Sequence, residues 1–458
     1  MSFALADPAR AAWAAGLAVA GAGLGILAGI DARLAVGLAL GVAFVLIALT
    51  SVTLGLCLFI ALEFLQLSGL GLSVEKMAGG LLALSWLGAM ALRRGEAERS
   101  LISAHPAFTG LLAFFVGWSL LSALWAAAPD VALASGLRYA QTAVFFLIVY
   151  TAVHTRQQAL WVVGAFVLSA GLAATLGLVL PSEVSDEGRL EGTYGEPNEY
   201  ATYLVVGLVL AVTLAGVRAV SAPLRLAAIA AGVLCSGAFL LTGSRAGLVA
   251  MGVALFMGVL VGGRRRIGTM VAVVLVAALA ATYFVSFAPA GIQQRVFTTE
   301  SSGRTDLWRI AGRMVEAHPV LGVGAGNFRE SSIDYLIQPG VIRRDEYIID
   351  RPNLVHNIYL GALAELGVVG LLLFGGILVF SLLCAVRAVR AFAHAGDRDM
   401  DVLARGLLVA IVAILAADFF ASEPYSKQLW LLLAMSPGLL AVARSEEPPG
   451  DGDAAPSW

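Results

Sequence analysis

Long, uninterrupted apolar runs recur along almost the whole chain, and they restrict its fold more than any other feature. Many runs reach about 18 residues, enough for a helix to cross a hydrocarbon core of about 30 Å. The chain is 59% hydrophobic and only 13% charged, whereas soluble domains are nearer half apolar and a quarter charged. Because the runs are continuous rather than alternating, they exclude a transmembrane β-barrel. We therefore expect an all-α polytopic membrane protein.

The sequence predicts about fourteen membrane spans, and twelve to fourteen is the range that it supports. They lie near 11–29, 34–50, 52–67, 75–92, 106–126, 138–153, 158–180, 199–216, 224–242, 245–262, 267–287, 356–386, 402–420 and 428–443. The crowded stretch 34–70 also fits one span fewer, and 356–386 is longer than one crossing requires. Further spans follow 11–29 at once and no cleavage site is visible, so we interpret it as a retained span rather than a signal peptide.

Arginines in the short connections set the expected orientation. They are Arg93, Arg94 and Arg99; Arg218 and Arg225; Arg264, Arg265 and Arg266; and Arg387, Arg390, Arg398 and Arg405. With fourteen spans these clusters share one face with Arg10 and Arg444, and the positive-inside rule makes that face cytoplasmic, together with both termini. The segments 181–198, 288–355 and 421–427 are then expected outside.

The segment 288–355 is polar and rich in arginine, and it is far longer than the other connections. Its arginines are Arg295, Arg304, Arg309, Arg313, Arg329, Arg343, Arg344 and Arg351. Loops above about sixty residues escape the positive-inside rule, so these charges do not contradict the orientation. Because the segment ends at His356, where the next apolar run begins, we expect it to handle an anionic, lipid-borne substrate at the membrane edge.

Part of this loop is predicted to form one short helix, capped by Thr305 and ended by Pro319. Its apolar positions at helical spacing are Leu307, Ile310, Ala311 and Met314. We expect that face to lie down on the membrane surface. Arg304 precedes the helix, whose free N–H groups and dipole also favour an anion, so it is either a phosphate ligand or an unspecialised surface residue. The glycine-rich stretch 322–328 is predicted to be a tight turn, because no strand precedes it as a dinucleotide fingerprint requires.

Three further positions are candidates for chemistry. Arg245 joins two spans with almost no connector, so it should lie at the outer membrane boundary and either snorkel or pair with an anion. His356 at the start of a span can accept a proton near pH 7 when neutral. The stretch from Arg189 through Glu196 and Asn198 is either a substrate contact or only a turn and helix start.

The other polar groups in the sequence give weaker evidence for a functional site. Three carboxylates are expected inside the membrane, each as a buried polar contact or an ion site, and they are Glu63, Glu365 and Asp418. The connector 397–401 lacks the residues of a calcium loop and is expected to be a solvated link. We find no Cys/His metal cluster and no serine nucleophile elbow, and the three cysteines are expected to pack as small apolar groups.

Read in order, four segments resemble the O-antigen ligase and polysaccharide polymerase superfamily. They are Arg189 to Gly195-Glu-Pro-Asn198, Thr242-Gly-Ser-Arg245, Ser302-Gly-Arg304 with Trp308 running on to Pro319 and Gly322-Val-Gly-Ala-Gly-Asn-Phe328, and Val355-His-Asn357 with Glu365-Leu-Gly367. The likeness covers roughly 185–375, and its specificity comes from the order and spacing of the motifs. The charged Glu196 departs from the pattern and could serve acceptor contact or loop pairing.

The resemblance implies an all-helical GT-C type glycosyltransferase that needs no cofactor or divalent metal. It implies a donor glycan on undecaprenyl pyrophosphate, a glycan or lipid acceptor, and action at the periplasmic face of a bacterial inner membrane. By motif, Arg245 and Arg304 resemble the arginines that hold the donor pyrophosphate, and His356 resembles the histidine that activates the acceptor. Arg189, Glu196, Asn198 and Asn357 are candidate substrate contacts.

The apolar runs and the resemblance together divide the chain into N-terminal spans in 1–180, a ligase-like core in 181–380 that includes 288–355, and C-terminal spans in 381–444. The segment 445–458 is rich in Pro, Gly, Asp and Glu, which predicts a disordered cytoplasmic tail. A chain-length regulator is a candidate partner, and nucleic acid is not. The motifs fit a polymerase and a ligase equally, with a transporter or flippase for lipid-linked glycans, or an outer-face binding scaffold, as the alternatives.

Overall fold

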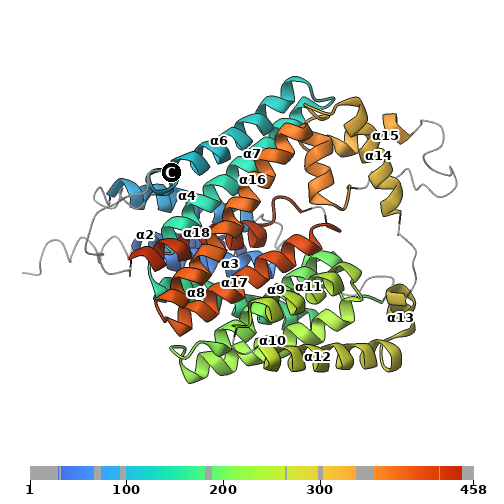
Figure 1. Cartoon of the computed structure of the whole chain (residues 1–458). Helices are drawn as coiled ribbons and strands as arrows, with labels where there is room; N and C mark the ends of the chain where they lie inside the picture. The colour runs from blue at the N-terminus through green and yellow to red at the C-terminus, as the bar shows by residue number, and fades with distance from the viewer. Residues whose placement is uncertain are drawn as a thin grey trace, which may run out of the picture.

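The chain folds as a bundle of helices (Figure 1). This computed structural model describes residues 32–66, 74–92, 100–180, 188–263, 266–297, 303–336, 354–421 and 423–445, together with Gly29. Within them the regular elements are helices, which confirms the all-α class. The α-helices are α2 (Ala32–Thr50), α3 (Val52–Leu65), α4 (Val74–Leu92), α5 (Leu101–Ala104), α6 (Pro106–Leu121), α7 (Pro129–Ala152), α8 (Arg156–Val179), α9 (Pro197–Gly216), α10 (Ala222–Thr242), α11 (Arg245–Val261), α12 (Arg266–Ser286), α13 (Ala290–Phe297), α14 (Arg304–Ala317), α15 (Phe328–Leu336), α16 (Ile358–His394), α17 (Arg398–Ala417) and α18 (Lys427–Ser445).

Eight helices in the described part of the chain are long and apolar enough to cross a membrane. They are α6 with the turn that follows it, α7, α8, α9, α10, α16, α17 and α18. Each expected span from 34–50 to 428–443 coincides with one helix, because a helix satisfies its own backbone hydrogen bonds in lipid. A polytopic membrane protein is therefore confirmed. The expected span 11–29, the cluster at 93–99 and the tail beyond residue 445 lie outside the described residues.

The start of α7 differs from the prediction, and the difference changes where Arg138 lies. The structure starts α7 at Pro129, whereas the apolar pattern placed the start of this span at residue 138. Proline suits the first helical position because its missing N–H needs no acceptor there, and Asp130 complements the helix dipole. Arg138 therefore lies inside a membrane-spanning helix, about 13 Å beyond its first residue at 1.5 Å per residue.

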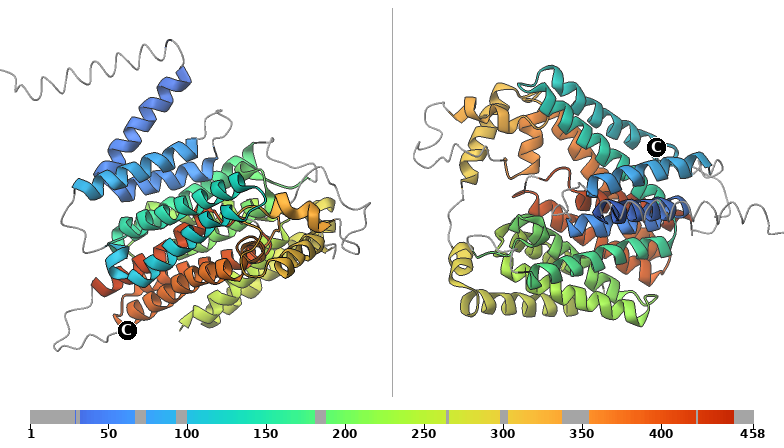
Figure 2. Two further views of the ribbon diagram at one scale, coloured as in Figure 1. Left: turned by 90° about the horizontal axis from the view of Figure 1, so that it is seen from above. Right: turned by 180° about the vertical axis from the view of Figure 1, so that it is seen from behind.

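The bundle has two chemically different ends. One end carries α13, α14 and α15, together with the starts of α9, α11 and α16 (Figure 1), and we call it the loop end. The view from behind shows α12 along one edge of the bundle, with α13 at its loop end (Figure 2). The described arginines of the short connections lie toward the opposite end, and they are Arg218, Arg225, Arg266, Arg387, Arg390, Arg398, Arg405 and Arg444.

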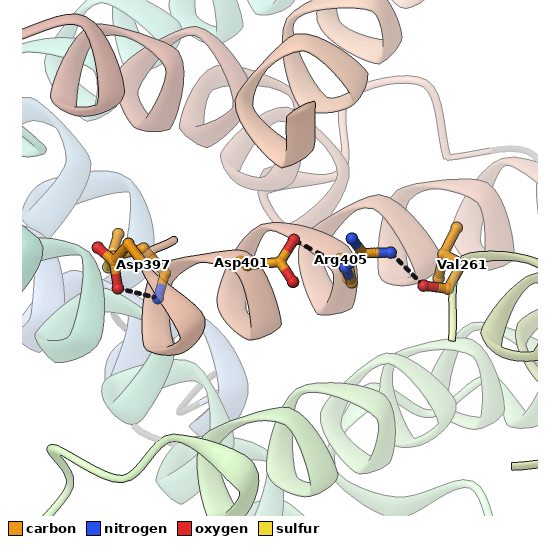
Figure 3. A network of polar contacts seen from close by, with 5 residues as sticks. Val261, Asp397, Asp401 and Arg405 are labelled. Atoms are coloured by element: carbon orange, nitrogen blue, oxygen red, sulfur yellow. Dashed lines mark hydrogen bonds and ion pairs between the residues drawn. The ribbon is translucent and has the colours of Figure 1, made fainter. Parts of the chain in front are cut away.

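The connector between α16 and α17, at that opposite end, is more than the solvated link that was expected. Asp397 caps α17 and pairs with Arg156 of α8 at 2.9 Å. One turn further on, Asp401 and Arg405 form an ion pair at 2.7 Å, and Arg405 also donates to the carbonyl of Val261 at the end of α11 (Figure 3). The connector thus ties α8 and α11 to α17.

At the loop end, the glycine-rich stretch 322–328 folds against α16 and confirms the predicted tight turn. The backbone N–H of Gly324 donates to the carbonyl of Glu365 at 2.8 Å. The Glu365 carboxylate accepts from the N–H groups of Gly326 at 2.7 Å and Phe328 at 3.4 Å. Glu365, which is half-buried, is therefore a polar contact that anchors the loop to the bundle.

A kink in α16 makes room for this turn. Gly367 interrupts the helix with a left-handed φ of 68°, and the next N–H, of Val368, donates to the carbonyl of Pro319 at 2.9 Å. A Cβ at Gly367 would collide with the backbone of Val320. The kink explains why the expected span 356–386 is longer than one crossing requires.

The surface position predicted for the short loop helix is wrong. The helix is α14, which starts at Arg304 after a left-handed Gly303 rather than after a Thr305 cap. Its four apolar positions are buried, as their spacing predicted, but they pack on the protein residues Val323, Phe328, Val355 and Ala364. Burial against the bundle removes this apolar face from the membrane surface.

We predict that Gly367→Ala lowers the free energy of unfolding by about 2 kcal/mol or more, because the new Cβ meets backbone atoms at a left-handed residue. Gly375→Ala in the same helix is the matched control, since a Cβ there meets nothing within 4 Å. Thermal unfolding in detergent measures both variants. Equal unfolding temperatures for the two would contradict the described packing of the loop on α16.

Candidate active site

Arg245, Arg304 and His356 come from three distant segments, and all three lie at helix starts of the loop end (Figure 1). Arg245 is the first residue of α11, Arg304 is the first residue of α14, and His356 precedes the N-cap of α16. The N–H groups at a helix start lack intrahelical acceptors, and the helix dipole makes that end positive. These positions therefore suit an anionic ligand.

The start of α11 is held by Asn198. Ser244, the N-cap of α11, donates its hydroxyl to the Asn198 side-chain oxygen at 2.8 Å. The same oxygen accepts from the buried Arg189 at 3.3 Å, and Arg189 also donates to the carbonyl of Thr242 at 2.8 Å. Arg189 and Asn198 thus fix the short connector that presents Arg245, whose side chain is half-buried.

Glu196 belongs to the same framework. Its carboxylate caps α9 by accepting from the N–H of Glu199 at 2.6 Å, and it accepts from the Asn198 side-chain amide at 2.7 Å. A negative charge is favourable at a helix start. Of the two roles that the sequence left open for Glu196, the structure shows loop pairing.

The surroundings of Arg304 differ from those of its neighbours. Its guanidinium carbon lies 5.8 Å from the ring centroid of Phe420, a cation–π distance, and its side chain is half-buried. Arg309, one turn along the same helix, is exposed and pairs with Asp306 at 3.1 Å. Arg304 therefore contacts the connection between α17 and α18, whereas Arg309 pairs with a residue of its own helix.

The backbone on both sides of His356 is pinned. The indole N–H of Trp308 in α14 donates to the carbonyl of Val355 at 3.1 Å. The N–H of Ile358 donates to the carbonyl of Asp418 at 3.1 Å. Between them, the buried Asn357 caps α16 by accepting two backbone N–H groups, at 3.0 and 2.9 Å. These contacts hold His356 in a left-handed conformation with φ of 52°.

The pKa of His356 is lowered from its ordinary value of 6.5. Partial burial is the main cause, because it penalises the imidazolium form, and the positive Arg304 lowers this pKa further. Glu196 acts in the opposite direction. His356 is therefore neutral at pH 7 and able to accept a proton, and both Arg304 and Glu196 lie within its electrostatic range.

Several acidic residues lie near these helix starts, and the sequence gave no reason to group them. A Glu199 carboxylate oxygen lies 2.9 Å from the Tyr203 hydroxyl, which lies 2.8 Å from that of Ser426. Burial raises the pKa of Glu423 to about 7, and Glu196 adds to the rise. Burial also raises the pKa of Asp418, whose side chain is 4% exposed. Their spacing in sequence gave no signal, because the fold of the connection between α17 and α18 brings them close.

These carboxylates do not form a metal site. Among the described residues there is no group of three or more His, Cys, Asp or Glu side chains that could hold a metal ion. Glu63, the third carboxylate that the sequence singled out, is half-buried near the end of α3. The cysteines are free, with Cys235 and Cys384 buried and Cys57 half-buried, as expected of small apolar groups.

Residues 230–375 match the family described as O-antigen ligase. The matched stretch contains Arg245, Arg304 and His356 and three of the four motifs quoted from the sequence, while the motif at 189–198 lies before it. This match supports the resemblance that the motifs carry. A search of curated proteins finds no match for the chain.

The conformation of His356 leads to a stability prediction. A left-handed backbone costs roughly 1–2 kcal/mol for a residue with a Cβ and little for glycine. We therefore expect His356→Gly to unfold at a higher temperature than His356→Ala, although both lack the imidazole. Thermal unfolding of the two variants side by side measures the difference. A less stable glycine variant would contradict the left-handed conformation.

Proposed function

We propose that this protein is a membrane glycosyltransferase of the O-antigen ligase type that acts on undecaprenyl-pyrophosphate-linked glycans. The observation that carries the proposal is a half-buried histidine within electrostatic range of an arginine at a helix start, both inside the stretch that matches the family. A ligase moves a finished glycan to another acceptor, and a polymerase joins repeat units to one another. Both need the same displacement at the anomeric carbon of a lipid-linked donor.

Arg245 and Arg304 are proposed to hold the donor pyrophosphate. A pyrophosphate leaving group gathers negative charge as its bond to the sugar breaks, and fixed guanidinium groups in a site of low dielectric stabilise that charge. Each arginine also stands at a helix start, where backbone N–H groups and the dipole act in the same sense. Two such positions supply the charge stabilisation that a divalent metal gives in other transferases.

His356 is proposed as the general base. The acceptor hydroxyl oxygen forms the new bond to the anomeric carbon from the face opposite the pyrophosphate. Its proton passes to His356, while the bond between the anomeric carbon and the pyrophosphate oxygen breaks and its electron pair leaves with the lipid pyrophosphate. This in-line displacement inverts the anomeric configuration. The described contacts of Arg189, Glu196, Asn198 and Asn357 support a positioning role for these four residues.

The loop end is proposed to face the periplasm. The arginines of the short connections gather toward the opposite end of the bundle, and such arginines mark the cytoplasmic side of membrane proteins. With that orientation, the helix starts that carry Arg245 and Arg304 open toward the side on which lipid-linked glycans are assembled into long chains. Both chain termini are then in the cytoplasm.

The two alternatives place different demands on these residues. A transporter or flippase would hold its substrate near the middle of the membrane, whereas the three proposed site residues lie at helix starts. A binding scaffold would need the arginines but not a neutral histidine held in a left-handed conformation. The transferase accounts for both features.

We predict that Arg245→Ala, Arg304→Ala and His356→Ala each abolish long glycan in the native host. Loss of a base typically costs about 10²–10⁴-fold in rate, and loss of one charge-stabilising donor costs about 10²–10³-fold. Gel analysis of glycan length, with immunoblotting of the membrane fraction, measures the effect. Arg309→Ala is the matched control, because Arg309 is exposed on the same helix as Arg304.

A pH prediction follows from the charge of Arg304. Replacing Arg304 with Gln removes a positive neighbour that lowers the pKa of His356, so that pKa should rise. NMR titration of histidine-labelled protein measures the pKa directly, with the His356 signal assigned from the spectrum of His356→Gln. Arg309→Gln should leave the pKa unchanged. If the pKa of His356 stays the same or falls in Arg304→Gln, the charge of Arg304 does not act on His356, which would contradict the prediction.

A further inference from the structure

A second site lies beside the proposed catalytic one. A cavity of about 360 Å³ opens between α7, the start of α16, the glycine-rich turn and the connection between α17 and α18. Its volume is within the range of small-molecule pockets, which combine apolar walls with a few polar groups. Neither Arg245 nor Arg304 nor His356 lines it, although Val355 and Asn357, the neighbours of His356, both do. The cavity is thus adjacent to the proposed site and distinct from it.

Arg138 gives this cavity a positive charge. It lies inside α7, about 13 Å from the first residue of that helix at 1.5 Å per residue. Within the described part of the chain no carboxylate lies within ion-pair distance of Arg138, although Glu423 lies within its electrostatic range, and the Arg138 side chain is exposed. An arginine inside a membrane-spanning helix is costly unless it faces a partner or a water-filled cavity, and Arg138 lines this cavity, so its position points to a ligand.

An aromatic wall faces the same space. The guanidinium carbon of Arg138 lies 5.8 Å from the ring centroid of Tyr425, and the ring of Tyr139 lies 4.5 Å from that of Tyr425. Ser135 also lines the cavity beside Tyr139 and Tyr425. An aromatic ring presents apolar area at little conformational cost, and the hydroxyl groups beside it can bond to a polar ligand.

The remaining polar groups refine the chemistry. The Glu365 carboxylate also lines the cavity, but it accepts from the N–H groups of Gly326 and Phe328 and is not free for a ligand. Asp130 is exposed at the mouth of the cavity on α7. A ligand here meets one cation, one free carboxylate, hydroxyl groups and an aromatic face, which together suit a sugar ring with an anionic substituent.

We propose that this cavity is the acceptor subsite and that it binds an acidic sugar, with the ring on Tyr425 and a carboxylate or phosphate substituent on Arg138. This inference rests on the proposed transferase function. A sugar held there would approach His356 past its two neighbours, Val355 and Asn357, which line the cavity. The lipid pyrophosphate would occupy the separate position between Arg245 and Arg304. Arg138 would then select for acidic acceptors.

The surroundings of Arg138 favour a soluble ligand over a bilayer headgroup. Arg138 lines the cavity together with Tyr425 and residues of the glycine-rich turn, and its guanidinium group lies against the Tyr425 ring. Tyr425 and Pro424 come from the connection between α17 and α18, which enters the bundle at this point. A soluble group that enters from the loop end reaches both walls of the cavity.

Saturation-transfer NMR on the whole protein in nanodiscs tests the proposal. The probes are methyl β-D-glucuronide, glucose 6-phosphate and the neutral methyl β-D-glucoside. We expect at least one acidic probe to bind more tightly than the neutral one. Arg138→Gln should weaken that binding by about tenfold or more, the usual effect of losing a charge-assisted hydrogen bond. Tyr425→Ala should weaken binding of all three probes.

Controls separate this cavity from the donor site. Arg304→Gln and Arg309→Gln should leave probe binding unchanged, and thermal unfolding checks that every variant is folded. Binding lost in Arg304→Gln but kept in Arg138→Gln would overturn the proposal, as would acidic probes that bind no better than methyl β-D-glucoside. Because the assay reads binding and not glycosidic bond formation, failure of the cavity and failure of the transferase are distinguishable. If the protein binds these probes through Arg138 but forms no glycosidic bond, the sugar site is supported and its role as the acceptor subsite is overturned.

Discussion

The half-buried carboxylate of Glu365 joins the polar loop to the membrane bundle, and the arrangement of the site depends on that junction. Its two hydrogen bonds from Gly326 and Phe328 hold the glycine-rich turn on α16. The turn sets the position of α14, whose buried face packs on Val355 and Ala364 beside it. Separating the turn from α16 would leave this carboxylate and the two backbone N–H groups without their partners, which costs free energy, so these contacts favour the docked loop.

From that junction the geometry of the site follows. Docking of α14 places Arg304 near Phe420 and lets Trp308 hold the carbonyl of Val355, which fixes the backbone next to His356. At the start of α11, Asn198 accepts a hydrogen bond from the N-cap Ser244 and so fixes the position of Arg245. Two rigid supports therefore present the two arginines. Preorganised charges of this kind stabilise a leaving group without further movement.

The sequence predicted the helices well and placed Arg245, Arg304 and His356 at or beside helix starts, because apolar runs and helix-start signals are local properties. The sequence-based prediction failed where contacts between distant segments determine the position of a residue. The face of α14 with Leu307 and Met314 was expected on the membrane surface, since amphipathic spacing does not reveal which apolar surface a helix meets. Arg138 was missed because the apolar run was taken to start at that residue, although Pro129 signals an earlier helix start. Glu423 and Tyr425 were missed because no local pattern shows that their connection enters the bundle.

The central claim is that this bundle catalyses glycosyl transfer from a lipid pyrophosphate rather than moving or only binding the glycan. The most direct measurement incubates purified protein, in detergent with a metal chelator, with undecaprenyl-pyrophosphate-linked oligosaccharide and its acceptor. Mass spectrometry then counts the new glycosidic bonds and the released lipid pyrophosphate. We expect equal amounts of both, with inverted anomeric configuration. Substrate that is bound but recovered intact, with no new glycosidic bond, would contradict the account.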